Sequence, residues 1–193
     1  MNISRDEAGE ALTAVFDTDR RARQFQGARS ASPYLILWGV VWFFANGVTG
    51  LAPQQAGTAW LVATVVGVLA TIAITVRQTL HRRAMNLHSA AESAAIGRRA
   101  AILGTTVIAF FPATLAVLAP LEPMKGSAFI SLFFAFAYMA SGAWLGLRMF
   151  VAGLVTAVAV LVGYLIFPQY YYLWMAVVGG GSLMLAGLWL RQP

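Results

Sequence analysis

The side chains that could hold a metal ion gather in one polar stretch, Arg77–Arg99, which contains both histidines of the chain. Four potential ligands lie there at offsets of 0, 4, 7 and 11: His81, Met85, His88 and Glu92. One continuous helix would place them on a single face, a ligand set suited to copper or another divalent metal. Two features weigh against this chemistry. A capping box from Ser89 to Glu92 would restart the helix, and the five arginines of the stretch would repel a cation. We therefore predict no metal site and no cofactor.

The arginines of this stretch are themselves candidate ligands for anionic lipid headgroups. They are Arg77, Arg82, Arg83, Arg98 and Arg99. A basic cluster beside a membrane contributes roughly 1 kcal/mol per residue to such binding. The alternative is a solvated helix at headgroup level, whose arginines hold the ends of two membrane spans on the cytoplasmic side.

A second polar group lies near the end of the first apolar run, at Asn46 and Thr49. The Asn46 amide has more donors and acceptors than its own helix can satisfy. One interpretation is structural, an interhelical hydrogen bond or a helix cap. The other is a ligand contact in an outward-facing pocket, together with Gln54, Gln55 or Tyr138.

Ionisable residues are absent from the central part of every apolar run in the sequence. Ionisable groups inside a membrane are costly and usually mark proton relays or ion pathways. Their absence argues against a proton-coupled transporter, a charged channel or an intramembrane hydrolase. The lack of cysteine excludes thiolate chemistry and disulfides. We predict that the protein is not an enzyme.

The composition indicates a membrane protein. Of the 193 residues 60% are hydrophobic and 10% charged, against about 25% charged residues in an average soluble domain. A span needs about 20 apolar residues, and six runs are long enough. They cover about residues 33–51, 58–76, 100–119, 127–147, 149–167 and 173–190. The expected fold is all-α, an integral membrane bundle of six transmembrane helices in three hairpins, formed by residues 33–191.

Residues 1–32 are expected to lie outside the lipid core as an amphipathic cytoplasmic helix. Apolar residues recur at helical spacing over residues 4–28, with acidic residues first and arginines after them. This helix would rest on the membrane surface or the bundle, or dock a cytoplasmic protein partner. No cleavable signal peptide is recognisable, so the first span should be retained.

The arginines also predict the orientation. With both termini inside, the inner segments carry twelve arginines and the outer loops carry only Lys125. Positive residues favour the cytoplasmic side, which predicts a multi-pass protein with both ends in the cytoplasm. Since the basic residues flank apolar runs rather than forming a basic soluble face, we expect no nucleic-acid binding.

Small residues predict close helix contacts. Gly142 and Gly146 form a GxxxG pattern in the fourth span, and Gly179 and Gly180 lie in a run of three glycines in the sixth. Such residues let helix backbones approach closely, inside the bundle or between two copies. We expect a homo-oligomer, with a dimer favoured, and a local weakening of the sixth helix at the three glycines.

Three segments resemble a family of small bacterial six-helix inner-membrane proteins of unknown function. They are DTDRRAR at residues 17–23, SPYLILWG at 32–39 and LWMAVVGGG at 173–181. The resemblance covers nearly the whole chain and implies the bacterial inner membrane. In size and hairpin layout the chain is also similar to HdeD-type membrane proteins. We expect a role in protein–protein or lipid interaction; the alternative is a small-solute or lipid-binding component of a transport system.

Overall fold

The computed structural model describes residues 5–84 and 112–192, together with positions 98, 102, 105, 106, 109 and 110. These residues form helices joined by short turns, and no β-strand occurs among them. Five helical segments are long and apolar enough to cross a membrane: Arg29–Leu51, Pro53–His81, Pro123–Ala143, Leu147–Ile166 and Pro168–Trp189. The expected all-α class is confirmed, and the described part of the chain supplies five candidate spans.

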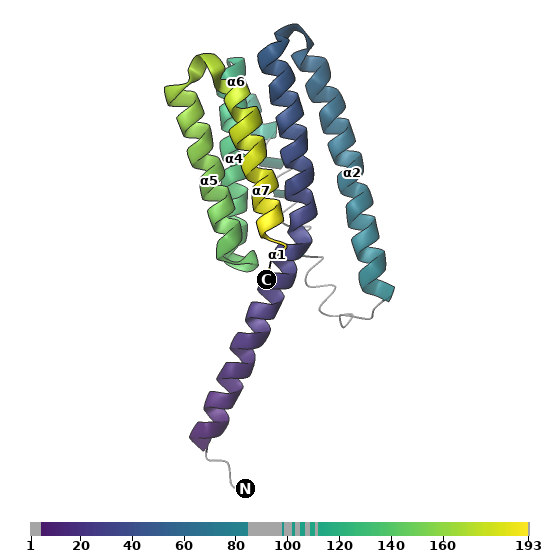
Figure 1. The fold of residues 1–193 in the computed structure, drawn as a ribbon, viewed down its shortest axis with the longest axis vertical. Coiled ribbons are helices and arrows are strands. Elements are labelled where there is room, and N and C mark those ends of the chain that lie inside the picture. Colours follow the sequence, from purple (N-terminus) through teal and green to yellow (C-terminus); the bar gives the residue numbers. More distant parts are fainter. Residues whose placement is uncertain are drawn as a thin grey trace.

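Helix α1 runs without interruption from Arg5 to Leu51. The sequence predicts a boundary at Ser32-Pro33, but Pro33 lies inside the helix. A proline inside a helix deprives the carbonyl four residues earlier of its partner. Here that carbonyl belongs to Arg29, an exposed residue. The N-terminal part of α1 extends beyond the bundle (Figure 1). The polar N-terminal half and the first span are therefore one helix of 47 residues.

Helix α2 (Ala56–Ala84) pairs with α1 through the short turn η1 (Pro53–Gln55). It continues eight residues past the predicted end at 76, because the following sequence contains no proline or glycine to stop it. Trp60 Nε1 donates to Thr49 Oγ1 at 3.1 Å near the turn. The Tyr34 and Thr75 hydroxyls are bonded at 2.9 Å toward the other end. These two bonds set the register of the hairpin.

Helices α4 (Pro123–Leu145) and α5 (Leu147–Ile166) form a second antiparallel hairpin. Helix α4 begins earlier than the predicted 127, because Pro123 suits a first helical position. It ends at Gly146, whose φ of 93° favours glycine and turns the chain directly into α5. A Cβ added to Gly153 of α5 would lie 2.6 Å from the Met139 backbone nitrogen, so the two helices are in close backbone contact.

The last span consists of four consecutive segments: η2 (Pro168–Tyr170), α6 (Tyr171–Trp174), the π-helical η3 (Met175–Gly180) and α7 (Gly181–Trp189). The π-helical turn covers two of the three consecutive glycines. Glycine has no Cβ, and its backbone therefore adopts conformations outside the α-helix more readily than that of most residues. Two glycines in this turn favour a π-helical interruption of the α-helix. Segments α6, η3 and α7 pack along α1, as Figure 1 shows for α7.

The buried core lies where α1, α4, α5 and the last span meet, around Leu35, Val160, Met175 and Leu183. Helix α2 lies at the edge: 6% of its span is buried in the described structure, against 39% of the α1 span. The exposed apolar face of α2 is therefore available to lipid or to another chain.

The predicted third span, 100–119, is described in part. Its positions 102, 105, 106, 109, 110 and 112–118 are helical, and the helix has ended at 119. Phe110 stacks on Phe133 of α4 with ring centroids 6.3 Å apart. Most of the 77–99 stretch lies outside the described residues, including Met85, His88 and Glu92, so the candidate metal-ligand face is not described.

Candidate functional site

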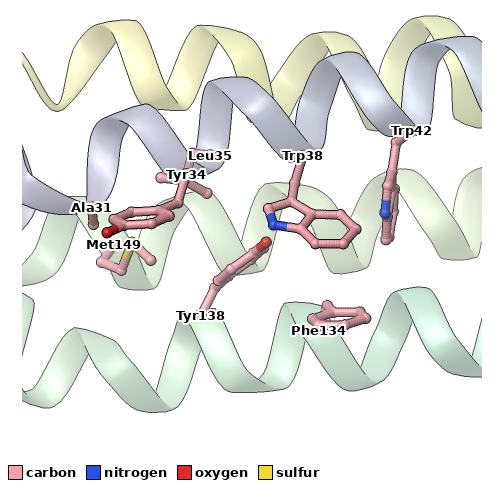
Figure 2. Close-up of a pocket in the computed structure, with 8 residues that line it drawn as sticks. All are labelled: Ala31, Tyr34, Leu35, Trp38, Trp42, Phe134, Tyr138 and Met149. Atoms are coloured by element: carbon pink, nitrogen blue, oxygen red, sulfur yellow. The ribbon is translucent and has the colours of Figure 1, made fainter. Parts of the chain in front are cut away.

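A cavity of about 220 Å³ lies between α1 and α4, next to the start of α5 (Figure 2). Eight residues line it: Ala31, Tyr34, Leu35, Trp38, Trp42, Phe134, Tyr138 and Met149. Five of them are aromatic, and none of the eight is charged. We call this cavity the aromatic pocket.

The spacing of residues along α1 builds one wall of the pocket. The lining residues of α1 are Ala31, Tyr34, Leu35, Trp38 and Trp42. Successive residues of this set are three, one, three and four positions apart, which places them on one face of the helix. Phe134 and Tyr138 of α4 are four residues apart and face this stripe in Figure 2. Trp42 meets Phe134 edge to face, with centroids 6.3 Å apart, which closes the end of the pocket nearest the centre of the span.

The polar atoms of the lining are few. Tyr34 uses its hydroxyl to bond Thr75 of α2, and Tyr138 points from α4 toward Trp38 in Figure 2. Tyr34, Trp38, Phe134 and Tyr138 are all partly exposed, so the pocket is open to its surroundings. Such a lining suits an apolar or weakly polar ligand that packs against flat rings.

The size of the pocket limits what enters it. An engineered apolar cavity of about 150 Å³ binds benzene, whereas drug-sized ligands occupy about 300–1,000 Å³. At about 220 Å³ the aromatic pocket accepts one ring or a few methylene groups. It therefore fits a segment of a hydrocarbon chain, with the rest of the molecule outside.

Of the polar residues predicted to share a site, the structure places only Tyr138 in the pocket. Gln54 is exposed in η1. Thr49 Oγ1 accepts from Trp60 of α2 and donates to its own helix. Asn46 is 2% exposed and donates to the Trp42 carbonyl at 3.0 Å. Its Oδ1 has no hydrogen-bond partner in the described structure.

The glycines predicted to mediate helix contacts have separate roles. Gly142 packs inside the chain, since a Cβ there would lie 2.7 Å from the Cβ of Phe150. Gly146 forms the turn after α4, so the two glycines do not share a helix face. Gly180 lies against the backbone of α1, where a Cβ would be 2.8 Å from the Gly39 carbonyl oxygen. A Cβ on Gly179 would meet Met175 of its own helix.

The arginines of the 77–99 stretch are described only in part. Arg77 of α2 and Arg98 are exposed. Arg82 and Arg83 belong to the last turn of α2. Arg99 lies outside the described residues. His81 is exposed on α2. Within the described residues no group of three or more histidine, cysteine or acidic side chains could hold a metal ion.

A polar junction that sequence reasoning missed joins the start of the first span to the end of the last. Ser32 is fully buried, and its Oγ donates to the Gly187 carbonyl at 2.5 Å. The same Oγ accepts from Arg191 Nε at 2.9 Å. Nearby, Arg148 Nη1 donates to the Gln192 carbonyl at 2.6 Å. The signal in the sequence was weak: a serine before an apolar run and an arginine after another.

Four arginines flank the ends of described spans at one end of the bundle, where α7 finishes and the N-terminal half of α1 departs (Figure 1). They are Arg29, Arg77, Arg148 and Arg191. We call this the basic end. The opposite end carries Lys125, which pairs with Glu122 at 3.1 Å. The described helices thus place their arginines together at one end, as the charge pattern predicted.

Comparison of the chain with protein-family models, with curated proteins and with solved structures finds no match. The resemblance to six-helix inner-membrane proteins stays a prediction.

Proposed function

We propose that this is a non-enzymatic integral membrane protein that acts by holding a membrane lipid in the aromatic pocket. The arrangement proposed is six spans, with residues 100–119 forming the third and both termini on the cytoplasmic side of a bacterial inner membrane. The observation that carries the functional proposal is the pocket itself, an open and uncharged cavity of about 220 Å³ with five aromatic rings in its wall.

The position of the pocket supports a ligand that comes from the bilayer. Its lining residues belong to three candidate spans, those of α1, α4 and α5. A molecule already dissolved in lipid reaches such a cavity without crossing water. Its volume fits a few methylene groups, as supplied by an acyl chain whose remaining length stays in the membrane.

The energetics of this binding differ from those of a pocket in a soluble protein. Moving a chain from lipid into the pocket removes no apolar surface from water, so the hydrophobic effect contributes little. The gain comes from dispersion contacts with rigid rings, each small and collectively large. The pocket therefore favours occupancy by a chain but provides little discrimination between lipids with the same chains.

Mass spectrometry of the intact protein tests the proposal. The variant Ala31→Phe adds a phenyl ring at the pocket wall. Since a cavity of about 150 Å³ holds benzene, one phenyl fills most of the pocket. Ala140→Phe makes the same change at an exposed position of α4 outside the lining and serves as the matched control.

We expect protein purified in mild detergent to retain lipid, the Ala140→Phe variant to retain the same amount, and Ala31→Phe to lose it. Equal retention by both variants would contradict a role for the pocket. Circular dichroism of the two variants checks that each keeps its helical content.

A further inference from the structure

The aromatic pocket begins beside the basic end. Two of its lining residues, Ala31 and Met149, adjoin residues of the polar junction in the chain. Ala31 precedes Ser32, which accepts a hydrogen bond from Arg191. Met149 follows Arg148, whose guanidinium donates to the Gln192 carbonyl. A phospholipid with a chain segment in the pocket therefore has its headgroup at the end of the bundle that carries these two arginines.

Hydrogen bonds and a ring contact hold these two arginines in place. Ser32 is 0% exposed and fixes Arg191 through Nε alone, and the terminal nitrogens of Arg191 make no hydrogen bond or ion pair with the described residues. Arg148 stacks over the Trp189 ring, 5.5 Å from its centroid. Holding the side chains in this way lowers the rotamer entropy lost when an anion binds.

The charge around the junction is positive. Arg29 and Arg77 are exposed at the same end. Glu122 is the one carboxylate among the side chains that the structure describes, and it lies at the opposite end of the bundle. A guanidinium fork matches the geometry of a phosphate, to which it gives charge-assisted hydrogen bonds.

We propose that the ligand of the aromatic pocket is an anionic phospholipid, with its phosphate bound by Arg191 and Arg148 and a segment of one acyl chain in the pocket. This inference rests on the proposed lipid-binding function and supplies the selectivity that the pocket alone lacks. The adjoining cavity favours a lipid over free phosphate as the source of the anion, because free phosphate would leave the pocket unused.

The test is a titration of delipidated protein in detergent, with bound species identified by intact-protein mass spectrometry. The added compounds are phosphatidylglycerol, diacylglycerol with the same chains and no phosphate, and inorganic phosphate. We expect phosphatidylglycerol to bind roughly tenfold more tightly than diacylglycerol, because only phosphatidylglycerol has a phosphate that accepts hydrogen bonds from the two arginines. Inorganic phosphate should neither bind measurably at these concentrations nor displace the lipid.

The arginine variants locate the headgroup. Arg191→Gln should weaken phosphatidylglycerol binding roughly tenfold and leave diacylglycerol binding unchanged. Arg148→Gln should act in the same direction, and Arg191→Lys, which keeps the charge, should lose less than Arg191→Gln. Lys125→Gln removes an equal charge at the opposite end of the bundle, away from the lining residues, and should change binding by less than about twofold.

Each contrary result has a distinct meaning. Equal affinity for both lipids, with binding still abolished by Ala31→Phe, overturns the headgroup inference and leaves the proposed function standing. An Arg191→Gln variant that is folded and binds phosphatidylglycerol like the native protein also overturns it. Displacement of the lipid by inorganic phosphate would assign the site to free phosphate. If no lipid binds at all, the proposed function itself is wrong.

Discussion

Replacing Gly180 by alanine tests the contact between the last span and the backbone of α1. A Cβ at this position would lie 2.8 Å from the Gly39 carbonyl oxygen, 2.9 Å from the Phe43 nitrogen and 3.1 Å from the Phe43 Cα. All three atoms belong to the backbone of α1, so no side-chain rotation relieves the overlap. The variant folds only if α1 and the last span move apart.

The neighbouring glycine provides a matched control. A Cβ on Gly181 would meet no atom within 4 Å. Replacing a helical glycine by alanine stabilises a helix by about 0.5–1 kcal/mol, and this gain applies to both positions. Overpacking costs about 1–3 kcal/mol, and it applies to Gly180 alone. We therefore expect Gly181→Ala to be slightly more stable than the native protein, and Gly180→Ala to be about 1–3 kcal/mol less stable than Gly181→Ala.

The assay is equilibrium unfolding of the three proteins in the same bicelles, followed by circular dichroism. The double variant Gly39→Ala/Gly180→Ala should show a loss that differs from the sum of the single losses, since both residues occupy one contact. Equal stability of Gly180→Ala and Gly181→Ala would refute the close approach of α1 to the last span.

Three further substitutions have defined outcomes in the same unfolding assay. Asn46→Leu should stabilise the protein by about 1 kcal/mol or leave it unchanged, because it removes a buried Oδ1 without a described partner; a clear loss would show that Oδ1 has a partner or ligand. Ser32→Ala should destabilise it by about 1–3 kcal/mol, since the Gly187 carbonyl loses a buried donor and Arg191 loses its acceptor; an unchanged midpoint contradicts the junction. Thr49→Val should cost about 0.6 kcal/mol by removing the bond from Trp60; stability equal to that of the native protein argues against the contact.

The sequence predicted the features that depend on local composition. Apolar runs located five of the spans to within a few residues, because length and hydropathy alone define a segment that fits a bilayer. The flanking arginines predicted which helix ends lie together. Boundaries were less accurate where helices continue beyond the apolar run, as α1 does through Pro33 and α2 does to Ala84. In both cases hydropathy indicates which residues fit inside the bilayer, but it does not indicate where the helix begins or ends.

The candidate site was predictable only in fragments. Tyr138 was singled out as a pocket residue, but the rest of the pocket depends on which faces of α1 and α4 meet. The contact between Ser32 and Arg191 joins residues 159 apart. Neither can be read from one sequence, because the rotation of each helix about its axis is set by packing against its neighbours. The oligomeric state and the role of residues 4–28 stay predictions.

Photocrosslinking in a bilayer tests the central claim most directly. The probe is phosphatidylglycerol with a diazirine in its acyl chain, present at a low mole fraction among unlabelled phosphatidylcholine, with crosslinked positions identified by peptide mass spectrometry. Binding in the aromatic pocket predicts crosslinks concentrated on Trp38, Phe134 and Tyr138, and their loss in Ala31→Phe. Crosslinks spread evenly over exposed apolar positions such as Leu61 and Leu69 of α2, with no enrichment in the pocket, would contradict it.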